Sequence, residues 1–325
     1  MKSLLALALM FAAGASASAA EAGGYLFVTF KGEQSPMTEQ IYFALSKDGR
    51  HWDALNGGEP ALVSKLGEKG VRDPYILRAH DGKFYIIATD LSINLNRDWG
   101  RAQNAASKSI VIWESPDLVK WSPPRLVRVA APDAGCTWAP EAVYDEDAHD
   151  YLVFWASRNR SDKFAKQRIW ASHTSDFRTF SKPEIYIEKP ADVIDTDIVF
   201  ENGKYYRFSK DETKSAITME TSDKIGGPWT EVPNFSLADL HGFEGPTCYQ
   251  LEKFDDGKPG KWCLMLDNYA KGEGYKAWVT DDLASGKFTP VQDEFSFPFL
   301  FRHGSVLALS TEEYDRLKQA FGSKN

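Results

Sequence analysis

The chain has 325 residues, and its 38 lysine and arginine residues against 46 aspartate and glutamate residues give a formal net charge of −8. This acidic balance argues against the broad positive field that holds nucleic acid or an anionic membrane, so we expect neither as a partner. Hydrophobic residues make up 43% of the chain, which is ordinary for a globular protein with enough apolar material for a core.

The N-terminal residues have the pattern of an export signal. Lys2 precedes the short apolar run "LLALALMFAAG", and "ASASAA" supplies the small residues that favour cleavage near Ala19 or Ala20. This run is too short to span a bilayer. We therefore expect residues 1–20 to be a signal peptide, residues 21–325 to form one domain, and the mature protein to be secreted or periplasmic.

Two sequence elements recur along the rest of the chain. A polar turn followed by an aromatic-rich strand appears in "HDGKFYIIATD", "EDAHDYLVFWAS", "ENGKYYRFSKD" and "DGKPGKWCLMLDN", and the N-terminal "AGGYLFVTFKG" is a weaker fifth copy. A strand that ends in Ser or Thr, followed by an acidic turn and an aromatic residue, appears in segments such as "IVIWESPDLVKW" and "IWASHTSDFRTF". Five copies at a spacing of about 50 to 60 residues are typical of a β-propeller. The sequence thus predicts an all-β fold, a five-bladed β-propeller with four antiparallel strands per blade.

The repeats also predict the order of the blades. Blades 1 to 4 are expected at residues 71–128, 137–185, 193–233 and 243–292. Blade 5 is composite: its inner strand comes from "RHGSVLALS" near the C-terminus, and its outer strands come from the N-terminal "YLFVTFKG" and "IYFALSKDG". This arrangement closes the ring and removes free sheet edges. Ser310 and Glu313 form a capping box, so "STEEYDRLKQAF" should be a short closing helix.

A polar residue stands near the start of each predicted inner strand, in "GVRDPYI", "TWAPEAVY", "VIDTDIVF", "FEGPTCYQ" and "FRHGSVLAL". These residues are Asp73, Glu141, Asp195, Glu244 and His303. Because inner strands line the channel of a propeller, the four acids and the histidine should converge on one opening. Each acid alone is better explained as a strand starter. Together they favour acid–base chemistry on a sugar, because crowded carboxyl groups differ in pKa and glycoside hydrolysis uses two of them.

These motifs, one per repeat and in order, resemble glycoside hydrolase family 43, the five-bladed propeller arabinosidases and xylosidases, over essentially the whole mature chain. The resemblance implies that Asp73 of "RDP" is the general base and that Glu244 of "EGP" is the general acid. It also implies that Asp195 of "VIDTD" tunes the acid. Asp197 lies on the same side of the strand as Asp195, and only the family motif separates the two.

The same resemblance matches Trp138 and Glu141 of "WAPE", which we expect to contact substrate. It also implies that His303 of "RHGS" lies near the axis and helps to bind a cation or an ordered water. We expect no required cofactor, and calcium or another cation near the axis is the one candidate.

Two arginines and one further tryptophan are weaker candidates for substrate binding. Arg72 and Arg302 flank axial residues, where each could hold a sugar hydroxyl or form a structural ion pair between blades. Trp99 lies in "NLNRDWGRAQNAASKS", an insertion within blade 1 that could overhang the site. Aromatic rings stack on sugar faces, but most of the 10 tryptophans must be packing residues.

We therefore expect an exported, monomeric, inverting glycoside hydrolase that binds carbohydrate and cleaves arabinofuranosyl side chains of plant polysaccharides or oligosaccharides. Asp73 would deprotonate a water while Glu244, kept protonated by its environment, donates to the glycosidic oxygen. β-Xylosidase, endo-arabinanase and galactofuranosidase activities stay open on the same fold. A fructosidase-like enzyme and a non-catalytic carbohydrate-binding propeller stay open as well. No "NDPNG"-like segment precedes Asp73, which disfavours the fructosidase.

Two further patterns allow a structural as well as a functional interpretation. Cys248 and Cys263 flank the turn "DDGKPG" and could form a disulfide or remain buried thiols, while the odd third cysteine, Cys136, leaves at least one free thiol. The run "DEDAHD" at residues 145–150 superficially resembles a calcium loop, but a solvated hairpin turn is the favoured interpretation.

Overall fold

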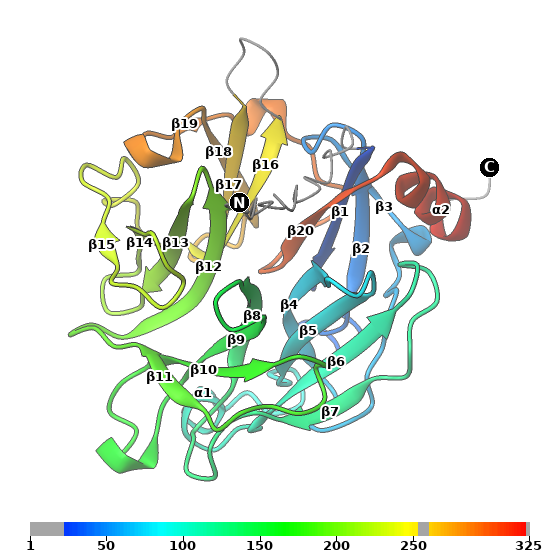
Figure 1. Ribbon diagram of the computed structural model, residues 1–325. Coiled ribbons are helices and arrows are strands. Elements are labelled where there is room, and N and C mark those ends of the chain that lie inside the picture. The colour runs from blue at the N-terminus through cyan, green and yellow to red at the C-terminus, as the bar shows by residue number, and fades with distance from the viewer. Residues whose placement is uncertain (1–22, 253–259, 323–325) are drawn as a thin grey trace, which may run out of the picture.

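The computed structural model describes residues 23–252 and 260–322 of the chain. In this part, five four-stranded antiparallel sheets form a ring around a central axis (Figure 1). The predicted all-β, five-bladed propeller is thus confirmed. The predicted signal peptide, residues 1–20, lies outside the described residues. None of the helices in the two described ranges is long and apolar enough to cross a membrane.

Each of blades 1 to 4 is one continuous segment whose strands follow chain order from the axis outward. Blade 1 contains β4 (Val71–Arg78), β5 (Phe84–Asp90), β6 (Ser109–Ser115) and β7 (Arg125–Arg128). Blade 2 contains β8 (Trp138–Asp145), β9 (Asp150–Ser157), β10 (Arg168–Thr174) and β11 (Glu184–Ile187). Blade 3 contains β12 (Val193–Glu201), β13 (Lys204–Asp211), β14 (Ala216–Ser222) and β15 (Thr230–Glu231). Blade 4 contains β16 (Glu244–Glu252), β17 (Lys261–Asp267), β18 (Tyr275–Thr280) and β19 (Thr289–Pro290).

Blade 5 joins the two ends of the described chain, as predicted. Its order is β20 (Ser305–Leu309), β1 (Gly24–Thr29), β2 (Tyr42–Ser46) and β3 (Trp52–Ala54). The C-terminal β20, red in Figure 1, therefore pairs with the N-terminal β1, blue, and closes the ring. The helix α2 (Thr311–Phe321) follows β20 at once, and Ser310 and Glu313 form its predicted capping box.

The remaining helices are short and lie in the connections. They are η1 (Asn56–Gly58), α1 (Trp99–Asn104), η2 (Arg160–Asp162), η3 (Leu283–Ser285) and η4 (Gln292–Glu294). The helix α1 lies in the insertion within blade 1, and the side chain of Asp98 caps it by accepting a hydrogen bond from the Arg101 N–H.

The core is divided among the interfaces between neighbouring blades. Alternate residues of a strand face the two sides of its sheet, so each blade contributes to two apolar clusters. Trp155 of β9 packs against blade 1, for example, and its neighbour Phe154 packs against blade 3. Five such clusters join the blades pairwise around the ring, and burial of this apolar surface stabilises the circular arrangement.

Two features that the sequence left open are decided by the structure. Cys248 and Cys263 are both free and buried, and they belong to different apolar clusters on opposite faces of blade 4. Of the two alternatives that the sequence left open, the structure shows the pair of buried thiols and not the disulfide. Residues 145–150 form the hairpin turn between β8 and β9, in which the Asp145 carboxylate accepts the backbone N–H groups of Asp147 and Ala148.

Candidate active site

The inner strands of blades 1 to 4 share one irregularity at the end where the candidate residues lie. Each strand has a shift of register there, and one residue in each shift has a positive φ. The four residues are Asp73 (φ 48°), Ala139 (φ 46°), Asp195 (φ 48°) and Gly245 (φ 54°). Such bulges redirect side chains, and strained backbone of this kind concentrates at functional sites.

The bulges show that the predicted acids do not occupy equivalent positions. Asp73 and Asp195 are the bulge residues themselves, whereas Glu244 precedes the bulge residue of its strand by one position. Glu141 and Asp197 follow the bulge residues of their strands by two positions. All four acids of blades 1 to 4 thus lie near the start of an inner strand, but only Asp73 and Asp195 are equivalent, because a bulge shifts the alternation of side chains.

Asp73 is held between blades 1 and 2 by a short hydrogen-bond relay. The hydroxyl of Thr89 donates to Asp73 Oδ2 at 2.9 Å, and the same hydroxyl accepts the N–H of Ala139 at 2.8 Å. Asp73 Oδ1 lies 3.6 Å from His303 Nδ1. The Asp73 side chain keeps 15% of its surface exposed, so a water can reach a carboxylate whose orientation is fixed.

Asp195 lies deeper and faces the same histidine. Its Oδ2 accepts the Gly245 N–H at 3.1 Å and lies 3.8 Å from His303 Nδ1. Burial raises the pKa of Asp195 to about 6; His303 opposes this effect and the Glu244 carboxylate adds to it. His303, from the segment before β20, thus lies close to the candidate carboxylates of blades 1 and 3.

Glu244 is placed as predicted, but its environment is the opposite of the expected one. Lys210 Nζ donates to Glu244 Oε2 at 3.0 Å, and Arg302 Nη2 donates to Oε1 at 3.3 Å. Burial alone raises the pKa of Glu244, but Lys210 and Arg302 outweigh it and the pKa is lowered. The expectation that its surroundings keep Glu244 protonated is therefore wrong for the unliganded site, where the carboxylate form is favoured.

Glu141 of β8 and Asp197 of β12 are two further buried carboxyl groups, each farther along its inner strand than the bulge residue. Asp197 accepts the Cys248 N–H at 2.7 Å, and both side chains are almost fully buried. Burial raises the pKa of Asp197 to about 7, and burial together with the Asp197 charge raises that of Glu141 well above its usual value. Glu141 and Asp197 are buried together on the inner strands of blades 2 and 3, which suits support of Asp195 better than contact with substrate.

The two candidate arginines are held in a network of ion pairs. Arg72 Nη1 lies 2.6 Å from Glu33 Oε1 and 3.4 Å from the buried Glu39. Arg302 Nε lies 2.6 Å from Asp267 Oδ2, and its Nη1 lies 3.7 Å from Glu33. Glu33 therefore bridges the two guanidinium groups, and the structure favours the ion-pair interpretation for Arg72. Arg302 combines that role with its direct contact to Glu244.

The two candidate tryptophans meet edge to face beside this network. Their ring centroids are 6.4 Å apart with an interplanar angle of 87°. Trp99 is 48% exposed and lies 5.7 Å from the Arg72 guanidinium, whereas the indole N–H of Trp138 is buried. Trp99, the weaker candidate by sequence, is therefore the ring with free surface for stacking.

His303 is the residue expected beside a possible axial cation. In the two described ranges, no three His, Cys, Asp or Glu side chains are grouped so that they could hold a metal ion. His303 instead lies near two aspartates that it can neutralise when protonated. No step proposed below runs through a cation.

Three residues that hold the candidate acids were missed by the sequence reasoning. Thr89, Lys210 and Asp267 each lie near the end of the second strand of a blade, and antiparallel pairing places that end opposite the start of the inner strand. The signal was present in the repeats, whose second strands end in "ATD", "SKD" and "MLD". Position within the repeat could have identified them.

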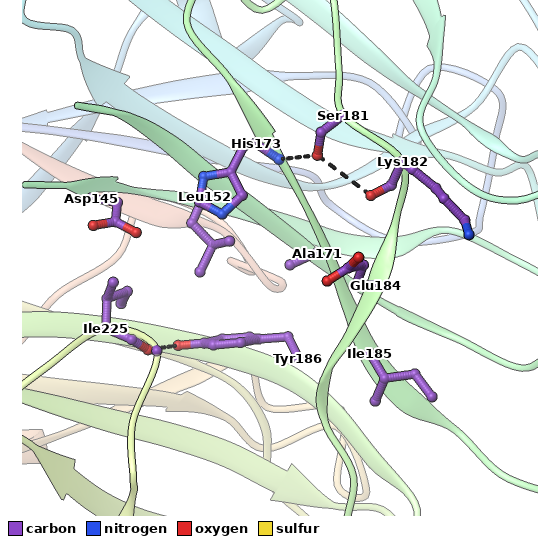
Figure 2. A pocket seen from close by; sticks show the side chains of 11 residues that line it. Asp145, Leu152, Ala171, His173, Ser181, Lys182, Glu184, Ile185, Tyr186 and Ile225 are labelled. Carbon is purple, nitrogen blue, oxygen red and sulfur yellow. Dashed lines mark hydrogen bonds between the residues drawn. The ribbon is translucent and has the colours of Figure 1, made fainter. Parts of the chain in front are cut away.

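A pocket away from the axis is lined by none of these residues. Its volume is about 400 Å³, and it lies between the outer strands of blade 2 and the loop after β14. Figure 2 shows Leu152, Tyr186 and Ile225 in this pocket, with the Tyr186 hydroxyl donating to the Ile225 carbonyl. The carboxyl groups at the axis, rather than this pocket, form the candidate active site.

Solved structures share this fold. A thermostable family-43 glycoside hydrolase gives a TM-score of 0.50 at 17% identity, with 74% of this chain and 76% of that chain covered. The family-43 protein BlXynB from Bacillus licheniformis gives a TM-score of 0.53 at 17% identity, with 85% of this chain and 54% of that chain covered. At these identities the likeness supports the fold alone.

Sequence comparison extends from the fold to the family. An α-L-arabinofuranosidase of Bifidobacterium longum subsp. longum is 29% identical to this chain, which is covered over 82% of its length and spans 28% of that relative. Residues 21–315 match the family described as a probable glycosyl hydrolase domain, related to glycoside hydrolase family 43. Because this match covers most of the sequence, the chain belongs to that glycosyl hydrolase family.

Proposed function

We propose that this protein is an exported, inverting exo-glycosidase that removes arabinofuranosyl side chains from plant polysaccharides or oligosaccharides. One observation carries the proposal: the carboxyl groups of Asp73, Asp195 and Glu244, from three blades, gather around one histidine and two cations, Lys210 and Arg302. Family membership implies a glycoside as substrate. The arabinofuranosyl group is inferred from the name of the Bifidobacterium longum relative.

We assign each carboxyl group a role in a single displacement. Asp73, partly exposed and oriented by Thr89, accepts a proton from a water whose oxygen attacks the anomeric carbon. The bond from that carbon to the glycosidic oxygen breaks, and Glu244 donates its proton to the leaving oxygen. Attack opposite the leaving group inverts the anomeric configuration. The proton on Asp73 then returns to solvent.

Asp195 sets the charge around the two reacting groups. Its carboxylate and that of Glu244 each favour protonation of the other, because like charges in a buried site are costly. Once Glu244 is protonated, Asp73 and Asp195 are the carboxylates left near His303, where the imidazole can balance their charge. This arrangement agrees with the tuning role that the family resemblance implies for Asp195.

Substrate contacts are proposed on the Trp99 side of the site. The exposed indole of Trp99 offers an apolar face to a sugar ring, and the edge of Trp138 supports it from the side. Arg302 can reach a sugar hydroxyl because it already contacts Glu244, whereas Arg72 acts through its ion pairs.

A panel of aryl glycosides tests the proposed activity. We expect hydrolysis of aryl α-L-arabinofuranosides by the wild type, loss of activity in Asp73→Ala and Glu244→Ala, and unchanged activity in Asp223→Asn, whose side chain is exposed on blade 3. NMR of early product should show the inverted anomer. A retained anomer, or activity that survives both alanine substitutions, contradicts the proposed mechanism.

The same panel separates the competing activities. Preference for aryl β-xylosides, galactofuranosides or sucrose assigns the site to a xylosidase, galactofuranosidase or fructosidase, and release of oligosaccharides from linear arabinan indicates endo action. Carbohydrate binding without turnover of any substrate indicates a non-catalytic propeller. N-terminal sequencing of protein from the culture medium or periplasm checks export, since it should begin after residue 20.

A further inference from the structure

Lys210 is a buried cation whose position the catalytic scheme does not yet explain. It lies near the end of β13, opposite Ile194 of the neighbouring inner strand, and it is 2% exposed. A buried ammonium group is costly unless anions or aromatic faces surround it. The groups that contact Lys210 therefore indicate which charges it stabilises.

Two carboxylates and one aromatic ring surround the Lys210 ammonium. Nζ lies 3.0 Å from Glu244 Oε2 and 2.6 Å from Glu212 Oε2, and it lies 4.1 Å from the centre of the Tyr269 ring. Burial lowers the pKa of Lys210, but Glu244, Asp195 and Glu212 outweigh it and raise the pKa. The side chain therefore stays charged, with partners that remain if Glu244 is removed.

The two carboxylates differ in how freely they can follow the lysine. Glu212 lies just beyond the end of β13 and its side chain is 38% exposed, so it can adjust to the ammonium group. Glu244 is confined by Arg302, which Asp267 and Glu33 hold in turn. The other titratable groups facing Glu244 are Asp267, its cross-strand partner on β17, and His303 and Asp195, all of them buried. Lys210 is thus shared between Glu244 and one partly exposed carboxylate, Glu212, whereas Arg302 is also held by the buried Asp267.

We propose that Lys210 is a positioning residue that holds Glu244 in its ionised form before substrate binds and shifts onto Glu212 when a glycoside enters, so that Glu244 then takes up a proton and acts as the general acid. This inference rests on the proposed function and deepens it. The proton comes from solvent during binding and passes to the glycosidic oxygen. Glu244 is left ionised after turnover, and Lys210 returns to it.

Two substitutions should shift the alkaline limb of the pH–activity profile in opposite directions. In kcat/KM, the alkaline limb reports the pKa of the acid in the free enzyme. Lys210→Met removes a charge that lowers the pKa of Glu244, so this limb should move to higher pH by about one unit, since a close opposite charge shifts a carboxyl pKa by about 1–3 units. Glu212→Gln removes the competing carboxylate, so Lys210 stays on Glu244 and the limb should move to lower pH.

Comparison of the pH profiles of kcat and kcat/KM tests whether Lys210 leaves Glu244 when substrate binds. The reason is that kcat reports the pKa of the acid in the enzyme–substrate complex. In the wild type, the alkaline limb of kcat should lie at higher pH than that of kcat/KM. In Glu212→Gln this gap should narrow. Lys204→Met, on the same strand but exposed and paired with Asp223, is the matched control and should leave both limbs in place.

Carboxyl ¹³C NMR provides a readout that does not depend on turnover. The Glu244 resonance, assigned by its loss in Glu244→Gln, should titrate at higher pH in Lys210→Met than in the wild type and at lower pH in Glu212→Gln. Shifts in one direction for both variants, or no shift in Glu212→Gln, would overturn the proposal. If Lys210→Met does not fold, the NMR titration of Glu244 in Glu212→Gln alone tests the proposal. A wild type without glycosidase activity overturns the proposed function, whereas unchanged NMR titrations overturn the role of Lys210.

Discussion

The imidazole of His303 occupies the space that a side chain at Gly245 would need. A Cβ atom at Gly245 would lie 2.6 Å from His303 Cγ, and Gly245 has a φ of +54°, which other residues rarely adopt. The glycine of "EGP" therefore lets the bulge of β16 approach the histidine that faces Asp73 and Asp195. Glu244, one residue earlier, is positioned by the same bulge.

Gly245→Ala should damage both stability and activity. Backbone strain at such a position costs about 1–3 kcal/mol, and contact with His303 adds to the loss. Gly82→Ala is the control, because Gly82 also has a positive φ but lies in an open turn with nothing near its Cβ position. Urea unfolding and aryl glycoside hydrolysis measure the two effects. Equal destabilisation with full activity in both variants would contradict the steric role of His303.

Thr89→Val should lower activity with a moderate loss of stability. The substitution keeps the shape but removes the hydroxyl that orients Asp73 and satisfies the Ala139 N–H. A buried polar group left without a partner costs about 1–3 kcal/mol. Thr221→Val, which removes a hydrogen bond to the Tyr205 carbonyl far from the axis, controls for loss of a hydroxyl. We expect kcat to fall in Thr89→Val and to stay unchanged in Thr221→Val.

Asp197→Asn should flatten the dependence of stability on pH. The folded pKa of Asp197, about 7, lies above its ordinary value of 3.8, so the folded state binds the proton more tightly. This contribution is fully present below about pH 4 and is lost as the pH rises toward 7. The neutral amide removes it, so unfolding free energies measured from pH 4 to 7 should slope downward less than in the wild type. Asp223→Asn should leave the slope unchanged.

Glu244→Gln should affect substrates according to their leaving groups. An activated nitrophenolate needs little protonation, whereas an alkyl or sugar leaving group needs the acid. General acid catalysis contributes about 10²–10⁴-fold, so loss of this order is expected for natural oligosaccharides and much less for dinitrophenyl glycosides. Rates across a series of aryl leaving groups measure the dependence. A uniform fall across the series would assign Glu244 another role.

Trp99→Ala should weaken substrate binding without unfolding the protein. The ring is half-exposed, and aromatic contacts of this kind contribute about 0.5–1.5 kcal/mol, which corresponds to an increase in KM of about 2- to 10-fold. Phe200→Ala removes an equally exposed ring on blade 3 and should leave KM unchanged. If the two variants behave alike in steady-state kinetics on oligosaccharides, Trp99 is not a stacking platform.

The architecture was predictable because it is repeated. Each copy of "HDGKFYIIATD" or "ENGKYYRFSKD" supplies a turn and a strand, so five weak signals reinforce one another, and the blade bounds agree within a few residues. The composite blade was also predictable, because the ring closes only if β20 pairs with β1. Local patterns of two-residue period contain this information directly.

The site was less predictable because it depends on irregularities. A bulge has no reliable signature in one sequence, so Glu141 seemed equivalent to Asp73 although it follows the bulge and is buried against Asp197. The charge of Glu244 depends on Lys210 and Arg302, which are far from it in sequence and join it only through blade packing. Pairwise electrostatics between blades cannot be deduced from a motif within one blade.

Closure of the ring by β20 determines when the protein can become active. Arg302 contacts Glu244 and His303 faces Asp73, and both residues immediately precede that strand, so they are synthesised after every strand of blades 1 to 4. A nascent chain that has completed blades 1 to 4 therefore contains the three candidate acids and Lys210, but it lacks the Arg302 guanidinium and the His303 imidazole. Catalytic competence should therefore appear in one step, when β20 pairs with β1 and closes the last blade.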